Sequence, residues 1–437
     1  MKTVAFYTLG CKVNQYETDA MAGLFKKQGY KISDFKSLAD IYVINTCAVT
    51  EEAARKSRQV IRRAVKMNPD AVIAVVGCYS QIAAERVLKI PGVDLVIGSK
   101  NRHQIVELVE KLDKTKTKPL LEVEDIMKAR EFEEIFEYTY KEKTRAFLKI
   151  QEGCNQFCTY CIIPYARGPI RSRRPENVFR EAENLAKQGF KEVVITGVHL
   201  GAYGKELKDE NVDIGDIVEE ISKIEGIERI RISSIEPMEI TDDLIERLAG
   251  IKKVCRHYHI PLQSGSKKIL KWMNRRYTPD NFRHIVDAFR SKIPEVSIST
   301  DIMVGFPGET DELFDETMRF VEDVTFSRIH VFKYSKRAGT PAANFPNQVT
   351  KRKKEERSHK LIKLAQEQEK EYNKRFLGKT LKVLIEQEMN TGEGTQYEGL
   401  SDNYIRIYVK HKGLKKGEIY NVKIKRIENS HVIGELI

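Results

Sequence analysis

The N-terminal part of the chain repeats one pattern of apolar and polar positions. A short, mostly apolar stretch is followed by a cysteine, and then by a longer stretch whose apolar residues recur with the spacing of an amphipathic helix. The apolar stretches are residues 4–9, 41–46 and 71–77, and residues 93–99 add a further short strand. Strands that alternate with helices predict a parallel sheet with right-handed crossovers.

Three cysteines, Cys11, Cys47 and Cys78, come at the ends of these strands. Ligands of open α/β sheets bind in the crevice outside the carboxyl ends of the strands, so the three thiols can converge although they are far apart in sequence. A cysteine that only fills space in a core would more often lie inside a strand than recur in the turn after it. The pattern therefore predicts a shared metal site.

The middle of the chain carries a second group of cysteines. A strand at residues 144–153 leads into Cys154, Cys158 and Cys161, with Tyr160 just before the last of them. A zinc ribbon would need a further pair of Cys or His residues nearby, and none follows. Three thiolates can hold three irons of a 4Fe-4S cluster and leave the fourth iron open for an exogenous chelate.

Strand and helix units continue beyond this loop, and the pattern then changes. Residues 350–375 form a long charged helix, and from about residue 373 polar and apolar residues alternate between turn signals, which predicts about five β-strands. The strands predicted before that helix are residues 191–197, 229–234, 257–263, 296–305 and 328–334.

Composition narrows the class of protein. Of the 437 residues, 41% are hydrophobic and 32% are charged, as in a globular enzyme rather than a disordered chain. No secretory signal and no apolar run of roughly 18 residues is present, so a cytoplasmic protein is expected. Seven cysteines, an odd number, favour metal binding or catalysis over disulfides, and Cys255 is expected to be a packing residue. The net charge of +12 predicts a polyanionic partner.

Several motifs together resemble a known enzyme family. The spacing from Cys154 to Cys161, with Tyr160, is similar to that of the radical S-adenosylmethionine superfamily. The run CTYCIIPYARGPIRSR, with three further cysteines upstream, resembles the methylthiotransferases, which insert a methylthio group into a C–H bond. The segments GCKVNQYET, TGVHLGAYG, RISSIEP, LQSGSKKILKWMNRRYT and STDIMVGFPGET resemble the branch that acts on N6-threonylcarbamoyladenosine in tRNA.

The resemblance implies an α/β multidomain fold. It places an N-terminal parallel α/β sheet domain with an auxiliary iron–sulfur cluster at residues 1–135, and a central partial (β/α) barrel of the radical S-adenosylmethionine type at residues 140–372. A small antiparallel β-barrel, the RNA-binding TRAM domain, is implied at residues 373–437.

The resemblance also implies two 4Fe-4S clusters and S-adenosylmethionine as cofactors. The cluster on Cys154, Cys158 and Cys161 would cleave the cofactor to a 5′-deoxyadenosyl radical, which removes hydrogen from C2 of the modified adenosine beside the anticodon. The cluster on Cys11, Cys47 and Cys78 would hold the sulfur that is methylated and transferred. Many radical enzymes hold the cofactor's amino group with Gly-Gly-Glu, where this chain has Thr196-Gly197-Val198, so backbone carbonyls are expected to serve there. The cofactor-binding residues implied are Tyr160, Gly197, Glu236, Gln263, Ser264, Arg275 and Asp301.

The expected partners are the tRNA anticodon stem-loop and an electron donor such as flavodoxin or ferredoxin, for a monomer with no membrane contact. Basic side chains beside the cysteine loop and in the C-terminal strands are expected to contact RNA phosphates: Arg167, Arg171, Arg173, Arg174, Lys382, Lys423 and Lys425. Three alternatives stay open at this point, namely a methylthiotransferase for N6-isopentenyladenosine in tRNA, one for a ribosomal protein, and a non-catalytic iron–sulfur protein that binds RNA.

Overall fold

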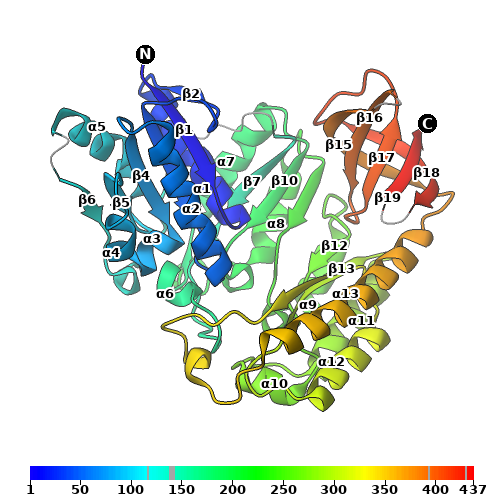
Figure 1. The fold of residues 1–437 in the computed structure, drawn as a ribbon. Coiled ribbons are helices and arrows are strands. Elements are labelled where there is room, and N and C mark those ends of the chain that lie inside the picture. Colours follow the sequence, from blue (N-terminus) through cyan, green and yellow to red (C-terminus); the bar gives the residue numbers. More distant parts are fainter. Residues whose placement is uncertain (116–117, 137–142, 392–393, 429–430) are drawn as a thin grey trace. The chain divides into compact units, whose positions relative to one another are not determined.

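The computed structural model describes residues 1–115, 118–136, 143–391, 394–428 and 431–437 (Figure 1). By their internal contacts these residues form two compact units that interleave along the chain. The first unit comprises Met1–Lys141, Lys149–Arg173 and Ser335–Ala343, and the second comprises Glu142–Leu148, Arg174–Tyr334 and Asn344–Ile437. The three domain limits given by the sequence stay a prediction, and the limit between residues 135 and 140 falls partly outside the described residues.

The core of the first unit is a six-stranded sheet in the order β2-β1-β3-β4-β5-β6. Every neighbouring pair in it is parallel, as the alternation of strands and helices predicts. The two edge strands β2 and β6 were not predicted, because they are too short to show a pattern. The strands are β1 (Thr3–Thr8), β2 (Lys31–Ser33), β3 (Ile41–Thr46), β4 (Val72–Gly77), β5 (Leu95–Ile97) and β6 (Leu120–Glu122).

Helices cover both faces of this sheet, so its central strands β3 and β4 are buried throughout. Helices α1 (Lys12–Lys27) and α5 (Ile105–Thr115) pack on one face. Helices α2 (Glu51–Met67), α3 (Cys78–Ile82) and α4 (Ala84–Leu88) pack on the other. The rest of this unit contains η1 (Arg102–Gln104), η2 (Ile126–Lys128), β8 (Gln151–Glu152), α6 (Ile163–Arg167), β9 (Arg171–Ser172) and most of η5 (Pro341–Asn344).

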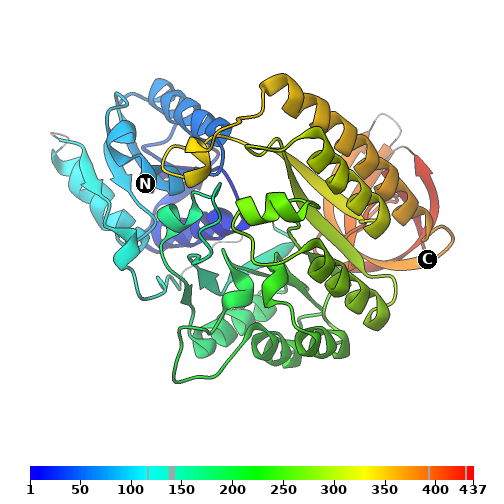
Figure 2. The same cartoon turned by 90° about the horizontal axis from the view of Figure 1, so that it is seen from below.

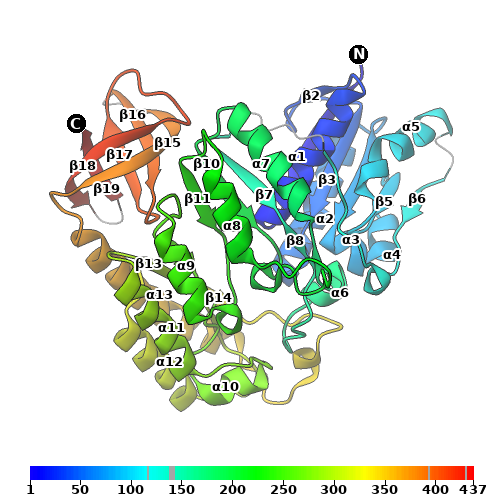
Figure 3. The same cartoon turned by 180° about the vertical axis from the view of Figure 1, so that it is seen from behind.

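Apart from Lys149, the last residue of β7, the second unit contains two three-stranded sheets, β11-β10-β7 and β12-β13-β14. Isolated parallel bridges join the two sheets between β11 and β12. The curved array is the partial barrel that was expected. Figure 3 shows helices α7 (Pro175–Lys187) and α8 (Ile214–Lys223) on the outside of its first three strands. The strands are β7 (Arg145–Lys149), β10 (Glu192–Thr196), β11 (Arg229–Ile232), β12 (His257–His259), β13 (Ser297–Val304) and β14 (Arg328–Lys333).

The helices of the partial barrel follow its strands along the chain. The long helix α13 packs along β14 and α12 and leads to the C-terminal strands, as its gold ribbon shows in Figure 2. The elements are α7 (Pro175–Lys187), η3 (Leu200–Ala202), α8 (Ile214–Lys223), η4 (Pro237–Glu239), α9 (Asp242–Gly250), α10 (Lys267–Trp272), α11 (Pro279–Lys292), α12 (Asp311–Val324) and α13 (Lys351–Lys374).

The C-terminal strands close into a five-stranded barrel in the order β15-β16-β17-β19-β18. Four of its pairings are antiparallel, as expected, but β17 and β19 pair in parallel. The reason is that β18, which lies between them in sequence, pairs with β15 on the other side, so β17 and β19 run in the same direction where the barrel closes. The strands are β15 (Thr380–Thr391), β16 (Gly394–Ser401), β17 (Arg406–Lys410), β18 (Ile419–Glu428) and β19 (His431–Leu436).

Within the second unit, arginines at the amino ends of the partial-barrel strands hold this small barrel. Arg229 donates to the carbonyls of Leu400 at 3.0 Å and Lys382 at 2.6 Å. Arg231 donates to the carbonyls of Ser401 at 3.1 Å and Asp402 at 3.0 Å. The two guanidinium groups thus donate to backbone carbonyls of the small barrel, at the end of β16 and on β15. These bonds fix the small barrel at the amino ends of the partial-barrel strands, opposite the carboxyl ends of those strands.

Candidate active site

The structure places Cys11, Cys47 and Cys78 after β1, β3 and β4, at the carboxyl ends of three neighbouring strands. The loops approach each other closely. Gly10 has a φ of 105°, and a Cβ at this position would lie 3.0 Å from Cys47 Cβ and 3.1 Å from Cys47 Sγ. Glycine is therefore required here, both for its conformation and for the contact between the two cysteine loops.

Burial is the main influence on the pKa of Cys47 and of Cys78. Burial raises the pKa of Cys47 and raises the pKa of Cys78 to about 12, while the positive charge of Arg167 acts in the opposite direction on both. The Nε of Arg167 donates to Cys78 Sγ at 3.0 Å. The Cys11 thiol in turn donates weakly to Asn14 Oδ1, at 3.7 Å. Arg167 thus supplies a hydrogen-bond donor and a positive charge for the Cys78 sulfur in its anionic form.

The second cysteine group, Cys154, Cys158 and Cys161, lies in the loop between β8 and α6 of the same unit. Backbone N–H groups aim at its sulfurs, since Gln156 donates to Cys154 Sγ at 3.5 Å and Ile163 donates to Cys161 Sγ at 3.4 Å. The Cys161 N–H closes a tight turn onto the carbonyl of Cys158 at 2.9 Å. These contacts fix the backbone of the loop around its sulfurs.

The start of this loop is held against the segment that follows α6. The Cys154 N–H donates to the carbonyl of Gly168 at 3.0 Å. Gly153, which precedes Cys154, has a φ of 76°, and a Cβ there would lie 1.8 Å from the carbonyl oxygen of Pro169. Only glycine allows the two segments to approach so closely, and the sulfurs are therefore presented by backbone geometry.

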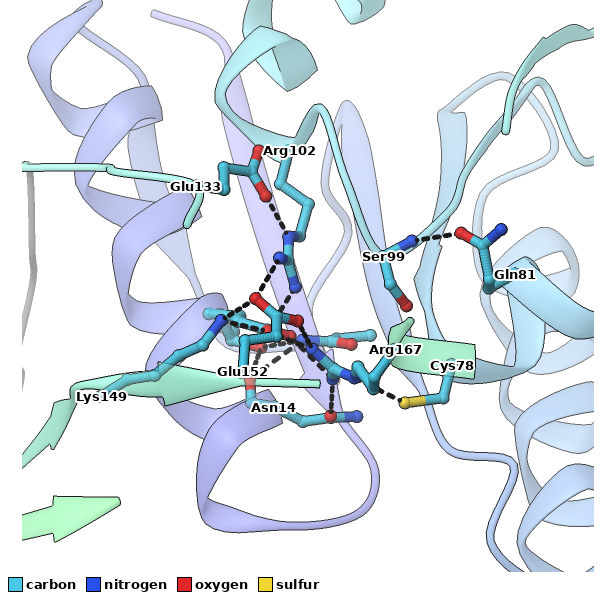
Figure 4. Close-up of polar contacts among 12 residues, drawn as sticks. Asn14, Cys78, Gln81, Ser99, Arg102, Glu133, Lys149, Glu152 and Arg167 are labelled. Atoms are coloured by element: carbon cyan, nitrogen blue, oxygen red, sulfur yellow. Dashed lines mark hydrogen bonds and ion pairs between the residues drawn. The ribbon is translucent and has the colours of Figure 1, made fainter. Parts of the chain in front are cut away.

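A buried network of charges lies beside Cys78 (Figure 4). Arg167, which is 1% exposed, donates to Glu152 at 2.7 Å and to Asn14 at 2.6 Å, and it pairs with Glu17. Lys149 donates to Glu17 at 2.9 Å and to Glu152 at 2.6 Å. All these groups belong to the first unit, so the network joins helix α1 to the segment that carries the second cysteine group.

The network keeps its carboxylates ionised. Burial would raise the pKa of Glu17, but the charges of Arg102, Arg167 and Lys149 outweigh it and lower the pKa to about 2. Burial acts in the same way on Glu152, and the same three cations hold its pKa well below the usual range. Buried carboxylates that stay charged need such partners, because an unpaired buried charge is very costly.

The structure corrects the prediction that four arginines beside the cysteine loop contact RNA. Arg167, Arg171 and Arg173 are 1%, 3% and 0% exposed, and their guanidinium groups are taken up by carboxylates and carbonyls inside the first unit. Arg174 alone of the four is exposed, with 55% of its side chain accessible, and it pairs with Glu210. The sequence shows a run of basic residues but does not show that three of them point inward.

The predicted cofactor residues of the second unit follow successive strands of the partial barrel. Gly197 follows β10, and Glu236, which follows β11, pairs with Arg275. Gln263 has a φ of 65° and donates its backbone N–H to the carbonyl of Asp301 at 2.8 Å. Asp301 lies in the middle of β13 rather than at its end. Its carboxylate is 3.3 Å from His259 Nε2.

Ser264 and Tyr160 differ from the other predicted cofactor residues in their surroundings. Ser264 is fully buried, and its hydroxyl lies 3.1 Å from Thr317 Oγ1, so it serves internal packing in this structure. Tyr160 belongs to the first unit, within the cysteine loop, whereas the other predicted cofactor residues belong to the second. Their roles toward a cofactor stay predictions.

The donor set fits an anionic iron–sulfur group. The buried network contains four cations and three carboxylates, which leaves one positive charge to be balanced beside the cysteines: Arg102, Lys149, Arg167 and Arg171 against Glu17, Glu133 and Glu152. Thiolate ligands of a cluster would supply that negative charge. Over the described ranges, no three His, Cys, Asp or Glu side chains are arranged to hold a single metal ion.

Among the helices that the structure describes, none is long and apolar enough to cross a membrane.

Sequence reasoning missed the polar residues that support the cysteines. Asn14 and Glu17 lie one turn apart on α1, and both are buried, at 1% and 3% exposure. Asn14 also donates to the carbonyls of Leu9 at 2.7 Å and Thr46 at 3.0 Å, the strand ends that precede Cys11 and Cys47. The available signal was the position of these two polar residues on one helical face directly after Cys11.

Comparison with known proteins agrees with this architecture. Residues 148–321 match the radical SAM superfamily model, and residues 3–98 match a model described as uncharacterized protein family UPF0004. The chain is 45% identical to the threonylcarbamoyladenosine tRNA methylthiotransferase MtaB of Bacillus subtilis, over 100% of this chain and 97% of that protein. It is 38% identical to the tRNA-2-methylthio-N(6)-dimethylallyladenosine synthase of Pelotomaculum thermopropionicum, over 100% and 98% of the two chains.

Solved structures support the fold. The radical S-adenosylmethionine methyltransferase TsrM from Kitasatospora setae superposes with a TM-score of 0.58 at 14% sequence identity, over 78% of this chain and 77% of that chain. At such low identity the likeness concerns the fold alone. The full-length identity to curated relatives carries the assignment, and it makes this protein an enzyme of the radical S-adenosylmethionine methylthiotransferase family.

Proposed function

We propose that the enzyme inserts a methylthio group at C2 of N6-threonylcarbamoyladenosine, the modified adenosine on the 3′ side of the anticodon in tRNA. The observation that carries this proposal is the identity of 45% to the Bacillus subtilis protein named for that substrate, against 38% to the relative named for the dimethylallyl substrate. The start of α1, with Lys12, Val13 and Asn14 after Cys11, supports the same branch.

The proposed cofactors are S-adenosylmethionine and two 4Fe-4S clusters. One cluster is on Cys154, Cys158 and Cys161, and the other is on the strand-end cysteines, Cys11, Cys47 and Cys78. When bound, these groups supply the radical that removes hydrogen from C2 and the sulfur that replaces it. The backbone N–H groups of Gln156 and Ile163 support the first site by donating to its sulfurs. Asn14 supports the second, since its amide donates to the strand ends before Cys11 and Cys47.

An exposed aromatic pair beside the cysteine loop supports a nucleobase as substrate. Phe157 and Tyr165 are 39% and 38% exposed, and their ring centroids are 5.8 Å apart in an edge-on arrangement. Phe157 has a φ of 46°, a conformation that costs a non-glycine residue of order 1 kcal/mol or more and recurs at functional sites. Exposed aromatic side chains stack on the bases of unpaired RNA, as in an anticodon loop.

The C-terminal barrel supports RNA binding through phosphate contacts. Lys382 on β15 and Lys423 on β18 are exposed, and the register of the two strands puts them two positions apart on the outer face. Lys425 is exposed too and lies 2.6 Å from Glu435. With Arg174 they form the proposed RNA-contact set, which contributes affinity without reading sequence. The proposal also includes an electron donor of the flavodoxin or ferredoxin class and a monomeric enzyme.

The test is mass spectrometry of tRNA nucleosides from a strain that lacks this enzyme, with and without a plasmid copy of the gene. Loss of the methylthio form of N6-threonylcarbamoyladenosine, and its return with the plasmid, is expected. Loss of the methylthio form of the isopentenyl nucleoside would instead assign the other tRNA branch. Unchanged tRNA, with a methylthio group missing from a ribosomal protein, would overturn the tRNA proposal.

A further inference from the structure

Arg167 connects the two cysteine groups within the first unit. It is the last residue of α6, the helix that begins two residues after Cys161. At the start of this helix, the Ile163 N–H donates to Cys161 Sγ at 3.4 Å, and at its end the Arg167 side chain donates to Cys78 Sγ at 3.0 Å. A helix of this length rises only about 7 Å. One short element therefore contacts sulfur from both groups.

The position of the guanidinium is fully determined by its partners. A guanidinium has five N–H donors, and Arg167 uses one at Nε, two at Nη1 and two at Nη2. Glu17, Glu152 and Asn14 accept the four Nη bonds, which leaves the Nε–H aimed at Cys78. Lysine offers neither this planar geometry nor a second fixed donor direction.

The helix itself is held in place. The Gly168 N–H closes α6 onto the carbonyl of Pro164 at 2.8 Å, and Gly168 has a φ of 70°. On the sheet side, Ala166 and Ile162 lie in the same hydrophobic core cluster as Cys78 and Tyr79. Arg167 is thus anchored through its backbone as well as through its side chain.

We propose that Arg167 is a positioning residue that sets the reduction potential of the iron–sulfur group held by Cys11, Cys47 and Cys78. This inference rests on the proposed function, because it assumes that these cysteines bind a cluster. Reduction adds a negative charge to a cluster, and a buried cation that hydrogen-bonds a ligand sulfur stabilises the more negative state. Second-shell partners of this kind orient the ligand and tune the metal group. Arg167 thereby makes this cluster easier to reduce.

The experiment uses the full chain with Cys154, Cys158 and Cys161 changed to alanine, so that only the strand-end cysteines can hold iron. This parent is reconstituted anaerobically, its iron is counted, and the reduction potential is measured by titration followed by electron paramagnetic resonance. Arg167→Met removes charge and hydrogen bond, and Arg167→Lys keeps the charge but loses the Nε bond. Arg171→Met is the matched control, since Arg171 is 3% exposed, donates to the Pro169 carbonyl at 2.8 Å and has no sulfur contact described.

All variants are expected to hold about as much iron as the parent. Arg167→Met should shift the potential to more negative values, and Arg167→Lys should shift it less. Arg171→Met should also shift it less than Arg167→Met, because it removes a cation of the same network but no described sulfur contact. An unchanged potential in Arg167→Met, or equal shifts in Arg167→Met and Arg171→Met, would overturn the proposal. Iron loss in both Arg167 variants but not in Arg171→Met would also overturn it, because the arginine would then build the site rather than tune it. If the parent variant holds no iron, Cys11, Cys47 and Cys78 do not bind a cluster, and the proposed role of Arg167 fails with it. The iron count shows this before any titration.

Discussion

The ammonium group of Lys149 lies 2.9 Å from the carboxylate of Glu17, although 132 positions separate the two residues in the chain. Lys149 ends the first strand of the partial barrel, and Glu17 lies on the helix that follows Cys11. This pair and its neighbours explain why residues 149–173 belong to the same compact unit as the N-terminal sheet. The two cysteine groups are therefore carried by one unit, which buried ion pairs hold together.

Glu17→Gln is expected to destabilise the protein by about 3–5 kcal/mol, because it leaves buried cations without their shared carboxylate. The measurement is chemical unfolding of the iron-free protein at pH 7. Glu107→Gln is the control, since the Glu107 side chain is 66% exposed and its pairing with Lys111 is worth little. Equal stability of Glu17→Gln and the wild type would contradict the account of the network.

The contribution of Glu17 should also depend on pH. Its folded pKa is about 2, below the ordinary value of 4.5, so its ionised form favours folding. That stability is fully present above about pH 5 and is lost as the pH falls through 4.5 toward 2. The difference in unfolding free energy between the wild type and Glu17→Gln is therefore expected to narrow when unfolding is repeated at lower pH within that window. A difference that stays constant would show that Glu17 is not the titrating group.

Gly10→Ala is expected to weaken iron binding at the strand-end cysteines, since the added Cβ would press on Cys47 and adopt an unfavourable φ. Gly29→Ala is the matched control, because Gly29 has a φ of 81° but no atom within 4 Å of the added Cβ. Both variants share the backbone strain, and only Gly10→Ala has the clash. The iron content after reconstitution should fall in Gly10→Ala alone. An equal loss of iron in Gly29→Ala would show that backbone strain, and not the clash with Cys47, causes the effect.

Arg231→Met is expected to loosen the C-terminal barrel within the second unit. The change removes donors to the carbonyls of Ser401 and Asp402, and leaves Glu192, which is fully buried, without its 2.7 Å partner. Loss of such a buried pair costs about 3–5 kcal/mol. Hydrogen exchange should accelerate at the turn between β16 and β17. Arg247→Met, which removes half-exposed ion pairs, is the control that should leave this turn protected.

The proposed RNA surface predicts a change in salt dependence. Lys382→Ala combined with Lys423→Ala should weaken tRNA binding and lower the slope of log affinity against log salt by about 1.5. Lys111→Ala is the control, because that exposed lysine of the first unit is already paired with Glu107 at 2.7 Å. A slope that the double variant shares with the wild type would exclude this face of the barrel from RNA contact.

The repeating units of the chain were predictable because they depend on local order. Strands β1, β3 and β4, and the cysteine after each, follow from apolar periodicity and from the rule that places ligands at the carboxyl ends of parallel strands. The five C-terminal strands follow from alternation in the same way. The edge strands β2 and β6, at three residues each, are too short to carry such a signal.

The buried charges were not predictable, because their partners are distant in sequence. Arg167 and Arg173 belong to a basic run that looks like a solvated surface, and only tertiary contacts with Glu17 and Glu134 show that both are internal. Burial of an arginine depends on whether carboxylates from other elements meet it, which no local pattern encodes. The same limit applies to Asn14, whose three loop contacts come from the strand ends around it.

In the proposed function the two cysteine groups have separate tasks. This separation is tested most directly by replacing Cys11, Cys47 and Cys78 together with alanine, and by measuring 5′-deoxyadenosine and methylthiolated tRNA nucleosides in the same reaction by liquid chromatography. We expect that 5′-deoxyadenosine still forms while the tRNA stays unmodified at C2. Wild-type levels of methylthiolated adenosine from this variant would contradict it, and so would loss of 5′-deoxyadenosine in a folded protein that keeps the iron of the other group.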